Sequence, residues 1–279
     1  MSAPFPPIVT GVQYPQSVFL DAFQDQDPDL FAAWGKQIEQ GWSAPELDRR
    51  PRQVVIVALE SLLHRPTAFI DHQVDQAFDA GSNVAELLEA LVHTQVLHGG
   101  LHSVHDGLES VERVVQRREK MGLPAPRGGT ALTAAERAAE APFVIEATKH
   151  AGPFFPYMQP SPRLYFQAWK KYDPGLFAAF MDFFSKKGEL RRGLSAKTEE
   201  LVVVAIDAAI LWPEPLIDHH LHAAFDAGAS VQEQVETILI ACEYSGADVK
   251  VIRYGLQALA RVIDQRVAAG VAPKRGLAA

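Results

Sequence analysis

Two segments of this chain have nearly the same sequence. Residues 70–81 and 217–228 are identical at eight of twelve positions, at a constant offset of 147. Independent segments would hardly ever agree so closely, so the chain contains an internal duplication. The duplication constrains the fold because both copies must adopt the same local structure. It also separates residues that both copies keep from residues that only one copy has.

The repeat extends in both directions from these segments. Residues 27–33 match residues 173–179 at an offset of 146, and Gly99 matches Gly246. We therefore predict one copy over residues 14–121 and a second over residues 160–268. The connector between them, residues 122–159, is rich in Pro, Gly and Ala but has helical composition over residues 131–150. We expect this connector to be ordered and partly helical.

The composition is that of a soluble globular protein, with 48% hydrophobic and 22% charged residues. A net charge of −8 argues against nucleic acid as the main partner, because phosphate binding requires a basic face. The first basic residue is Lys36, so no positively charged signal-peptide region precedes it, and Asp207 interrupts the longest apolar run. We expect a cytoplasmic protein with a small-molecule partner and no membrane contact.

The chain has one cysteine, Cys242. A single thiol excludes an intramolecular disulfide and any Cys-x-x-Cys redox pair. Because Cys242 lies in an apolar stretch with helical spacing, we expect it to be buried and inert.

The apolar run over residues 54–63 could in isolation be a buried strand. Its length and the candidate capping residues before it and its partner, Asp48 and Ser195, favour a buried helix. The next helix should begin near Pro66 and Pro213 and end at Gly81 and Gly228, where glycine can adopt the left-handed conformation that ends a helix.

Residues 83–86 and 230–233 then follow the capping-box pattern, so another helix begins in each copy. A last amphipathic helix is predicted over residues 101–118 and 249–267. Leading helices at residues 27–40 and 173–187 bring each copy to about five helices. The predicted fold class is all-α, with the two copies packed as a pseudo-dimer.

The second copy resembles a known family. Residues 194–205, His219 and His220, residues 226–230, Glu233 and residues 244–246 are similar to the carboxymuconolactone decarboxylase and alkylhydroperoxidase-D-like family. The first copy resembles it more weakly. The resemblance implies an all-helical unit with a Glu and a His lining a pocket, and assembly into a homo-oligomer. If single-copy relatives form hexamers, a fused double copy would form a trimer.

The peroxidase branch of that family uses a Cys-x-x-Cys pair, and here the matching positions are at or near Pro213 and Leu216, and Pro66 and Phe69 in the first copy. Without a thiolate there is no nucleophile for peroxide. The better match is the decarboxylase branch, which lacks the cysteines. It implies a cofactor-independent lyase or isomerase that acts on a small organic acid or lactone.

The resemblance assigns the catalytic Glu to Glu200. The catalytic His is His220 when counted back from Gly228, or His219 when counted forward from Glu200. The first copy has Gln53 and Gln73 where the second has Glu200 and His220. Since amides cannot relay a proton, only the second copy would be active. The alternatives are that Glu200 only stabilises a helix N-terminus and that His220 caps a surface.

Both copies keep an Asp-His pair, Asp71-His72 and Asp218-His219. A structural role, such as a hydrogen bond between the copies, is the favoured interpretation, although an active site built from both copies remains open. As candidate substrate-binding residues we name His72, His98, His102 and Tyr244.

Three first-copy histidines, at positions 98, 102 and 105, have the spacing of one helix face and could bind a divalent ion if a carboxylate joined them. We do not assign a metal or cofactor. Two alternatives to the lyase therefore remain: a non-catalytic ligand-binding or assembly protein, and a metal-dependent enzyme built on these histidines.

Overall fold

The structure is a computed structural model that describes residues 46–94, 100–127, 193–246 and 249–271, with a few isolated positions near residues 25–32 and 174–175. Every element in these ranges is a helix, which confirms the all-α class. The expected leading helices and the helical part of the connector lie outside the described residues. The eight helices are α4 (Arg49–Leu62), α5 (Thr67–Asp79), α6 (Val84–Thr94), α7 (Gly100–Met121), α12 (Ala196–Ala209), α13 (Glu214–Asp226), α14 (Val231–Tyr244) and α15 (Val249–Ala268).

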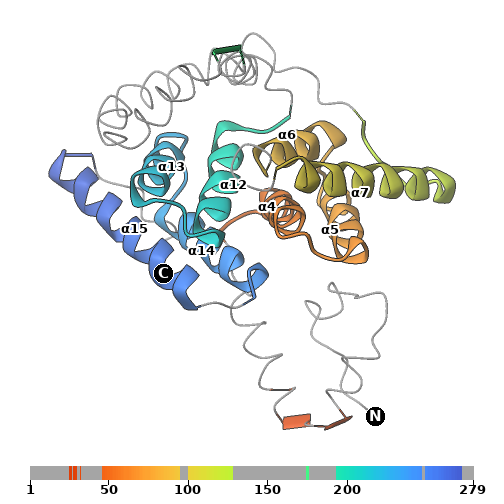
Figure 1. The fold of residues 1–279 in the computed structure, drawn as a ribbon, viewed down its shortest axis with the longest axis horizontal. Helices are drawn as coiled ribbons and strands as arrows, with labels where there is room; N and C mark the ends of the chain where they lie inside the picture. The colour runs from red at the N-terminus through yellow and green to blue at the C-terminus, as the bar shows by residue number, and fades with distance from the viewer. Residues whose placement is uncertain are drawn as a thin grey trace.

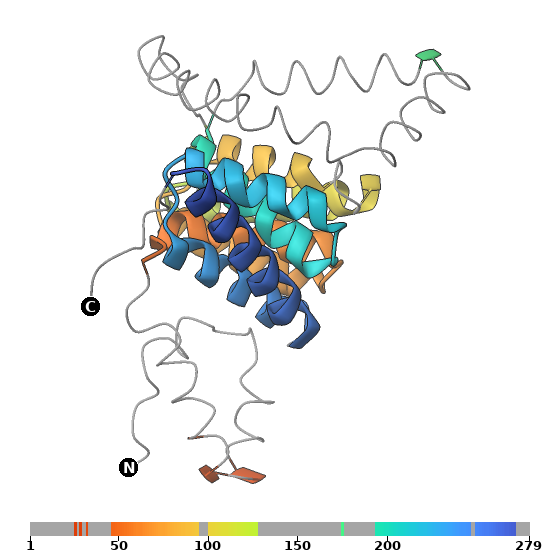
Figure 2. The same ribbon diagram turned by 90° about the vertical axis from the view of Figure 1, so that its left-hand side faces the viewer.

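The four helices of each copy have the same arrangement. Helix α4 packs against α5, α6 and α7, and α12 packs in the same way against α13, α14 and α15. The two sets lie beside each other with α4 and α12 in the middle (Figure 1), and the view turned by 90° shows them packed as one block (Figure 2). Between the copies, α4 contacts α12 and α14, and α12 contacts α4 and α6. Exchange of equivalent contacts is typical of a two-fold interface.

The central helices α4 and α12 form the core. All nine residues from Val54 to Leu62 are buried, as are all eight from Leu201 to Ala208. A helix that is apolar on every face requires neighbours on every side, which is why each central helix is surrounded. Ser195 caps α12 by accepting a hydrogen bond from the Thr198 amide, whereas Asp48 makes no such side-chain bond at α4.

The predicted chain reversals are confirmed. Gly81 and Gly228 both have a φ of +91°, which glycine adopts without strain. The two capping boxes that follow are also present, since Asn83 and Glu86 exchange hydrogen bonds of 3.1 and 3.0 Å. Ser230 and Glu233 exchange bonds of 3.0 and 2.8 Å. The expected burial of Cys242 is confirmed as well.

One carboxylate from each copy binds the backbone that enters the central helix of the other copy. Glu236 accepts hydrogen bonds from the amides of Glu46 and Leu47, at 2.9 and 3.0 Å. Glu89, which corresponds to Glu236, accepts one from the amide of Leu194 at 2.9 Å. These bonds satisfy backbone donors that lie just before α4 and α12 and would otherwise be buried without a partner.

The shared Asp-His pairs contribute an ion pair in each copy. Asp71 binds Arg113 at 3.0 Å, and Asp218 binds Arg261 at 2.7 Å. Both pairs join the second and fourth helices of one copy. For the Asp residues, the hydrogen bond between the copies that we gave as an example of a structural role was therefore wrong. The register of α5 and α13 directs these carboxylates toward α7 and α15 of their own copy.

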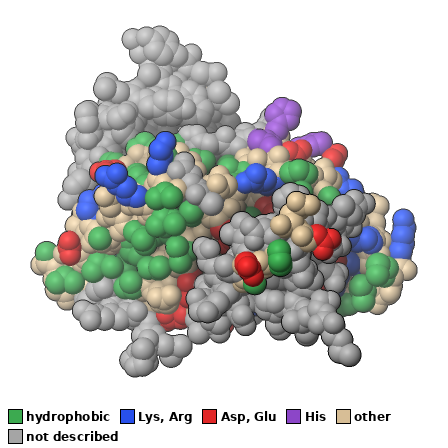
Figure 3. Space-filling model, turned by 90° about the horizontal axis from the view of Figure 1, so that it is seen from below, with side chains coloured by type: hydrophobic (Ala, Val, Ile, Leu, Met, Phe, Trp, Pro, Cys, Tyr) green, Lys and Arg blue, Asp and Glu red, His purple; other side chains and the backbone are tan. Residues whose placement is uncertain are grey.

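Hydrophobic side chains also reach the surface. On the face shown in Figure 3 they gather over the part of the molecule formed by the second copy. The large exposed hydrophobic residues of α14 and α15 are Leu239, Val249 and Val267. Within the described ranges, no helix has the length and apolar character needed to cross a membrane.

We predict that Glu236→Ala lowers the free energy of unfolding by about 2–4 kcal/mol, because two amides and the guanidinium of Arg52 lose their acceptor. Chemical denaturation measures the effect. The control is Asp264→Ala, an exposed acid on α15, which should change stability by less than about 0.5 kcal/mol. Equal changes in the free energy of unfolding for the two substitutions would show that the hydrogen bonds between the copies do not stabilise the fold.

Candidate functional site

Glu200 and His220 contact each other in the second copy. The Nδ1 atom of His220 lies 2.9 Å from Oε2 of Glu200, and about a fifth of each side chain is exposed. Glu200 lies near the start of α12, and His220 is in the middle of α13, which packs on it. A carboxylate on Nδ1 fixes the ring orientation and favours the tautomer with the proton on that nitrogen. In that tautomer Nε2 is the nitrogen that can accept a proton.

The contact distinguishes between the two candidate histidines. It is the ring of His220 that meets Glu200, whereas the ring of His219 packs edge-on against His220, with centroids 4.9 Å apart at 70°. Burial lowers the pKa of His219 to about 3, and the positive charge of His220 adds to this effect. His219 is therefore neutral at physiological pH, and its ring packs against that of His220.

Two further polar groups lie close to this pair. Asp207 on α12 is fully buried, and neither of its carboxylate oxygens has a hydrogen-bond partner among the described residues. Burial raises the pKa of Asp207 to about 7; the charge of His220 opposes this rise and that of Glu200 adds to it. The hydroxyl of Tyr254 on α15 is also buried without a partner in the described ranges, and burial together with Asp207 raises its pKa.

A second Glu-His contact joins the two copies. Nε2 of His93, on α6 of the first copy, lies 3.2 Å from Oε1 of Glu199 on α12. His93 is almost fully buried and Glu199 is 13% exposed. The N-terminal half of α12 thus binds one imidazole from each copy, through the successive residues Glu199 and Glu200.

The other predicted residues lie elsewhere. His72 is on α5, in the first copy, and His102 is exposed on α7. Tyr244 is the last residue of α14, and its backbone carbonyl accepts a hydrogen bond from Arg65. His98 is outside the described residues. A role for these four residues in substrate binding therefore stays a prediction.

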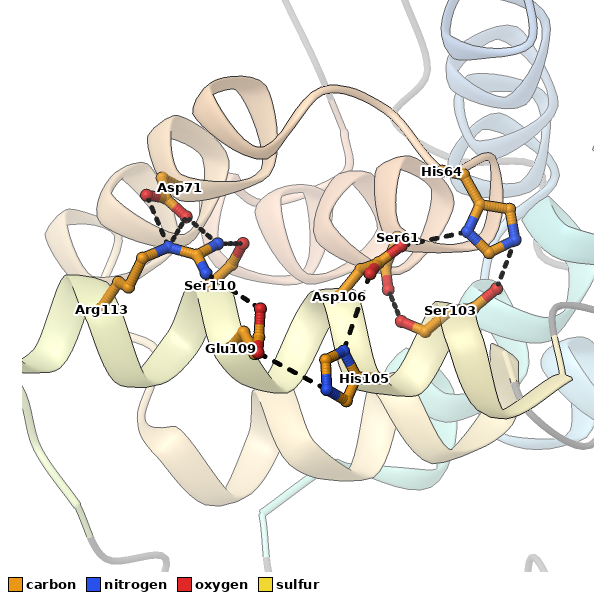
Figure 4. Close-up of polar contacts among 9 residues, drawn as sticks. All are labelled: Ser61, His64, Asp71, Ser103, His105, Asp106, Glu109, Ser110 and Arg113. Carbon is orange, nitrogen blue, oxygen red and sulfur yellow. Dashed lines mark hydrogen bonds and ion pairs between the residues drawn. The ribbon is translucent and has the colours of Figure 1, made fainter.

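The first copy has a polar network of its own along α7 (Figure 4). Nε2 of His64 lies 3.4 Å from Oγ of Ser103, and its Nδ1 lies 3.1 Å from the carboxylate of Asp106. The order of these contacts is that of a Ser-His-Asp triad. Ser103, however, is fully buried and its hydroxyl donates a hydrogen bond to the carbonyl of Leu62 at 3.5 Å, so this hydroxyl is not presented to a substrate.

The second copy has different residues at the positions that form this network. Leu211 stands where the first copy has His64, and both have a positive φ, of 54° and 50°. In α15 the offset is 148, as Gly107 and Gly255 show, so Val251 and Tyr254 correspond to Ser103 and Asp106. Since the same turn forms with an apolar side chain, the network stabilises the packing of the α4–α5 turn on α7. Within the described residues, no group of three His, Cys, Asp or Glu side chains is arranged to hold a metal ion.

Sequence analysis did not identify the role of Asp207, although a signal was present. At the offset of 147, Asp207 aligns with Glu60, so each copy has an acid in the middle of its most buried helix. An acid at such a position in both copies is unusual, because burying a carboxylate is unfavourable. Glu60 is also buried, and burial raises its pKa to about 7.

We predict that Glu60→Gln changes the pH dependence of stability. The pKa of Glu60 is higher in the folded protein than in the unfolded chain. Its contribution to the free energy of unfolding is therefore complete below about pH 4.5, and it is lost as the pH rises to about 7 and the buried side chain ionises. Gln does not ionise. Relative to the wild type, the variant should therefore gain roughly 3 kcal/mol between pH 4 and pH 8, at 1.36 kcal/mol per pKa unit. Parallel stability curves for the two proteins, measured by urea denaturation, would contradict this.

Comparisons with protein families and with solved structures each gave a match. No match was found among curated proteins. A crystal structure from Burkholderia xenovorans LB400, described as a candidate gamma-carboxymuconolactone decarboxylase subunit, matches with a TM-score of 0.46 and 20% identity over 90% of both chains. The family model of the carboxymuconolactone decarboxylase family matches residues 174–260, which include Glu200 and His220. The second copy of this chain is therefore similar in sequence to the carboxymuconolactone decarboxylase family.

Proposed function

We propose that this protein is a cofactor-independent lyase or isomerase of the carboxymuconolactone decarboxylase type. The contact between Glu200 and His220 is the observation that carries the proposal. Its substrate would be a small organic acid or lactone, bound against Nε2 of His220. The family match to the second copy supports this reaction class.

The chemistry follows from the arrangement of the pair. Loss of carbon dioxide, or movement of a double bond, leaves negative charge on a carbon next to a carbonyl group, and a proton must then be delivered or removed. An imidazole whose other nitrogen is held by a carboxylate can do both near neutral pH. Neutral His219 beside it adds no second positive charge that would lower the basicity of His220.

Thiol peroxidase chemistry has no suitable group at this site. The residues at the start of α13 are Pro213 and Leu216 where that chemistry requires cysteines, and Cys242 is buried on α14. The first copy lacks the acid–base pair, since it has Gln53 and Gln73. It therefore serves in this proposal as the packing partner of the active copy.

Assembly into a homo-oligomer, with the trimer as the expected form, also stays a proposal. Exposed hydrophobic residues on α14 and α15 provide surface that could be covered by another copy.

We predict that Glu200→Gln and His220→Gln, which give the second copy the first copy's residues, each lower turnover by roughly 10²–10⁴-fold. The assay follows carbon dioxide release from carboxymuconolactone, and exchange of carbon-bound protons with D₂O in a panel of small lactone acids. His105→Gln, an exposed first-copy histidine, is the matched control and should retain full activity.

Circular dichroism and thermal unfolding show whether each variant is folded. Full activity of a folded His220→Gln protein would disprove the assigned role. A wild-type protein that neither decarboxylates the lactone nor exchanges protons in any member of the panel would contradict the proposed reaction class.

A further inference from the structure

Asp207 belongs to the cluster around His220, but the proposed reaction does not use it. It follows Glu200 by seven residues on α12, so two helical turns separate them and they lie on nearly the same face. The side chain is fully buried and lacks hydrogen-bond partners among the described residues. A carboxylate in this position is stable only if it is protonated or if a nearby cation balances its charge.

Each copy supplies one cation to its buried acid, and the two cations differ in kind. In the first copy the charge of Arg65 acts on Glu60. An arginine is positively charged at all physiological pH values. In the second copy the position of Arg65 is occupied by Trp212, and the cation that acts on Asp207 is His220. The buried acid of the first copy therefore has a permanent positive charge near it, whereas the positive charge near the buried acid of the second copy can be lost by deprotonation.

The groups that act on Asp207 come from three helices. They are Glu200 on α12, His220 on α13 and Tyr254 on α15. Among the helices packed on α12, α13 supplies the cation that acts on this carboxyl group, His220. Only His220 in this set can become a cation.

We propose that Asp207 is a positioning residue for the Glu200–His220 pair: its buried carboxyl group and the imidazole share the charge of the site, so that each controls whether the other holds a proton. This inference rests on the proposed function for its catalytic meaning, but the coupling between the two groups is a property of the resting protein. When Asp207 is ionised it stabilises the imidazolium, and when it is protonated it makes the proton of His220 easier to release.

The test is a pair of NMR titrations on the full chain from pH 4 to pH 9. One follows the imidazole signals of His220, assigned by their loss in His220→Gln, and the other follows the ¹³C signal of the Asp207 carboxyl group in the wild type. The carboxyl group should titrate near pH 7, over the same range as His220, and the His220 curve should show two steps. Titration of Asp207 near pH 4, or of Asp207 and His220 independently of each other, would overturn the inference without any variant.

In Asp207→Asn the His220 curve should become a single step at a pH lower by about one unit, because the ionised acid no longer favours the imidazolium. Glu60→Gln is the matched control, since it removes the corresponding buried acid from the copy without an imidazole partner, and its His220 curve should overlay that of the wild type. A His220 curve in folded Asp207→Asn that overlays the wild type would contradict the proposal.

The two proposals fail separately. Coupled titration in a protein without lactone turnover would disprove the enzymatic function and leave the coupling in place. If turnover occurs, the pH–rate profile of Asp207→Asn should move in the same direction as the His220 curve. An unchanged profile would show that Asp207 does not act through His220.

Discussion

The packing of α4 against α12 is the interaction on which the rest of the structure depends. Each helix is buried on all sides over most of its length, by three helices of its own copy and by the central helix of the other. Neither copy covers its own central helix alone. The carboxylates of Glu236 and Glu89 complete this interface by binding the backbone that leads into the partner's central helix. The low-dielectric core formed in this way is also what raises the pKa of the acids placed inside it.

Duplication gives the protein two versions of one helical unit, and the candidate site lies where the versions differ. The features needed for folding occur twice: the glycine turns, the capping boxes, and the ion pairs of Asp71 and Asp218 with arginines. The acid–base pair occurs once, and its first-copy counterparts are amides. One copy therefore supports the fold while the other carries the candidate site. The cross-copy contact of His93 with Glu199 shows that the two are not independent, because the turn holding Glu200 is also bound by the first copy.

Much of the fold could be predicted from the sequence because its signals are local. Helix boundaries follow from Ser195, Gly228 and the capping boxes, whose effects extend over only a few residues. The pairing of Glu200 with His220 was accessible through the family resemblance, but the choice between His219 and His220 was not. That choice depends on the rotation of α13 against α12, which a one-residue change in the intervening loop alters by about 100°.

Contacts between distant helices could not be predicted in the same way. For the Asp-His pairs we gave a hydrogen bond between the copies as an example of a structural role, whereas Asp71 binds Arg113 of its own copy. The sequence pattern shows which side of a helix is buried, but not which neighbouring helix that side contacts. The importance of Asp207 was hidden for a related reason. In the sequence, Asp207 is only an acid that interrupts an apolar run. The fold shows that its side chain is nevertheless buried and that it lies near His220.

The most direct test of the account is a crystal structure of the protein with a bound lactone acid that resists turnover. We predict that the ligand lies in the second copy, with the carbon that would gain or lose a proton within reach of Nε2 of His220, and with Glu200 still bound to Nδ1. A ligand bound instead among the first-copy histidines, or one in the second copy that contacts neither His220 nor Glu200, would contradict the assignment of the active site.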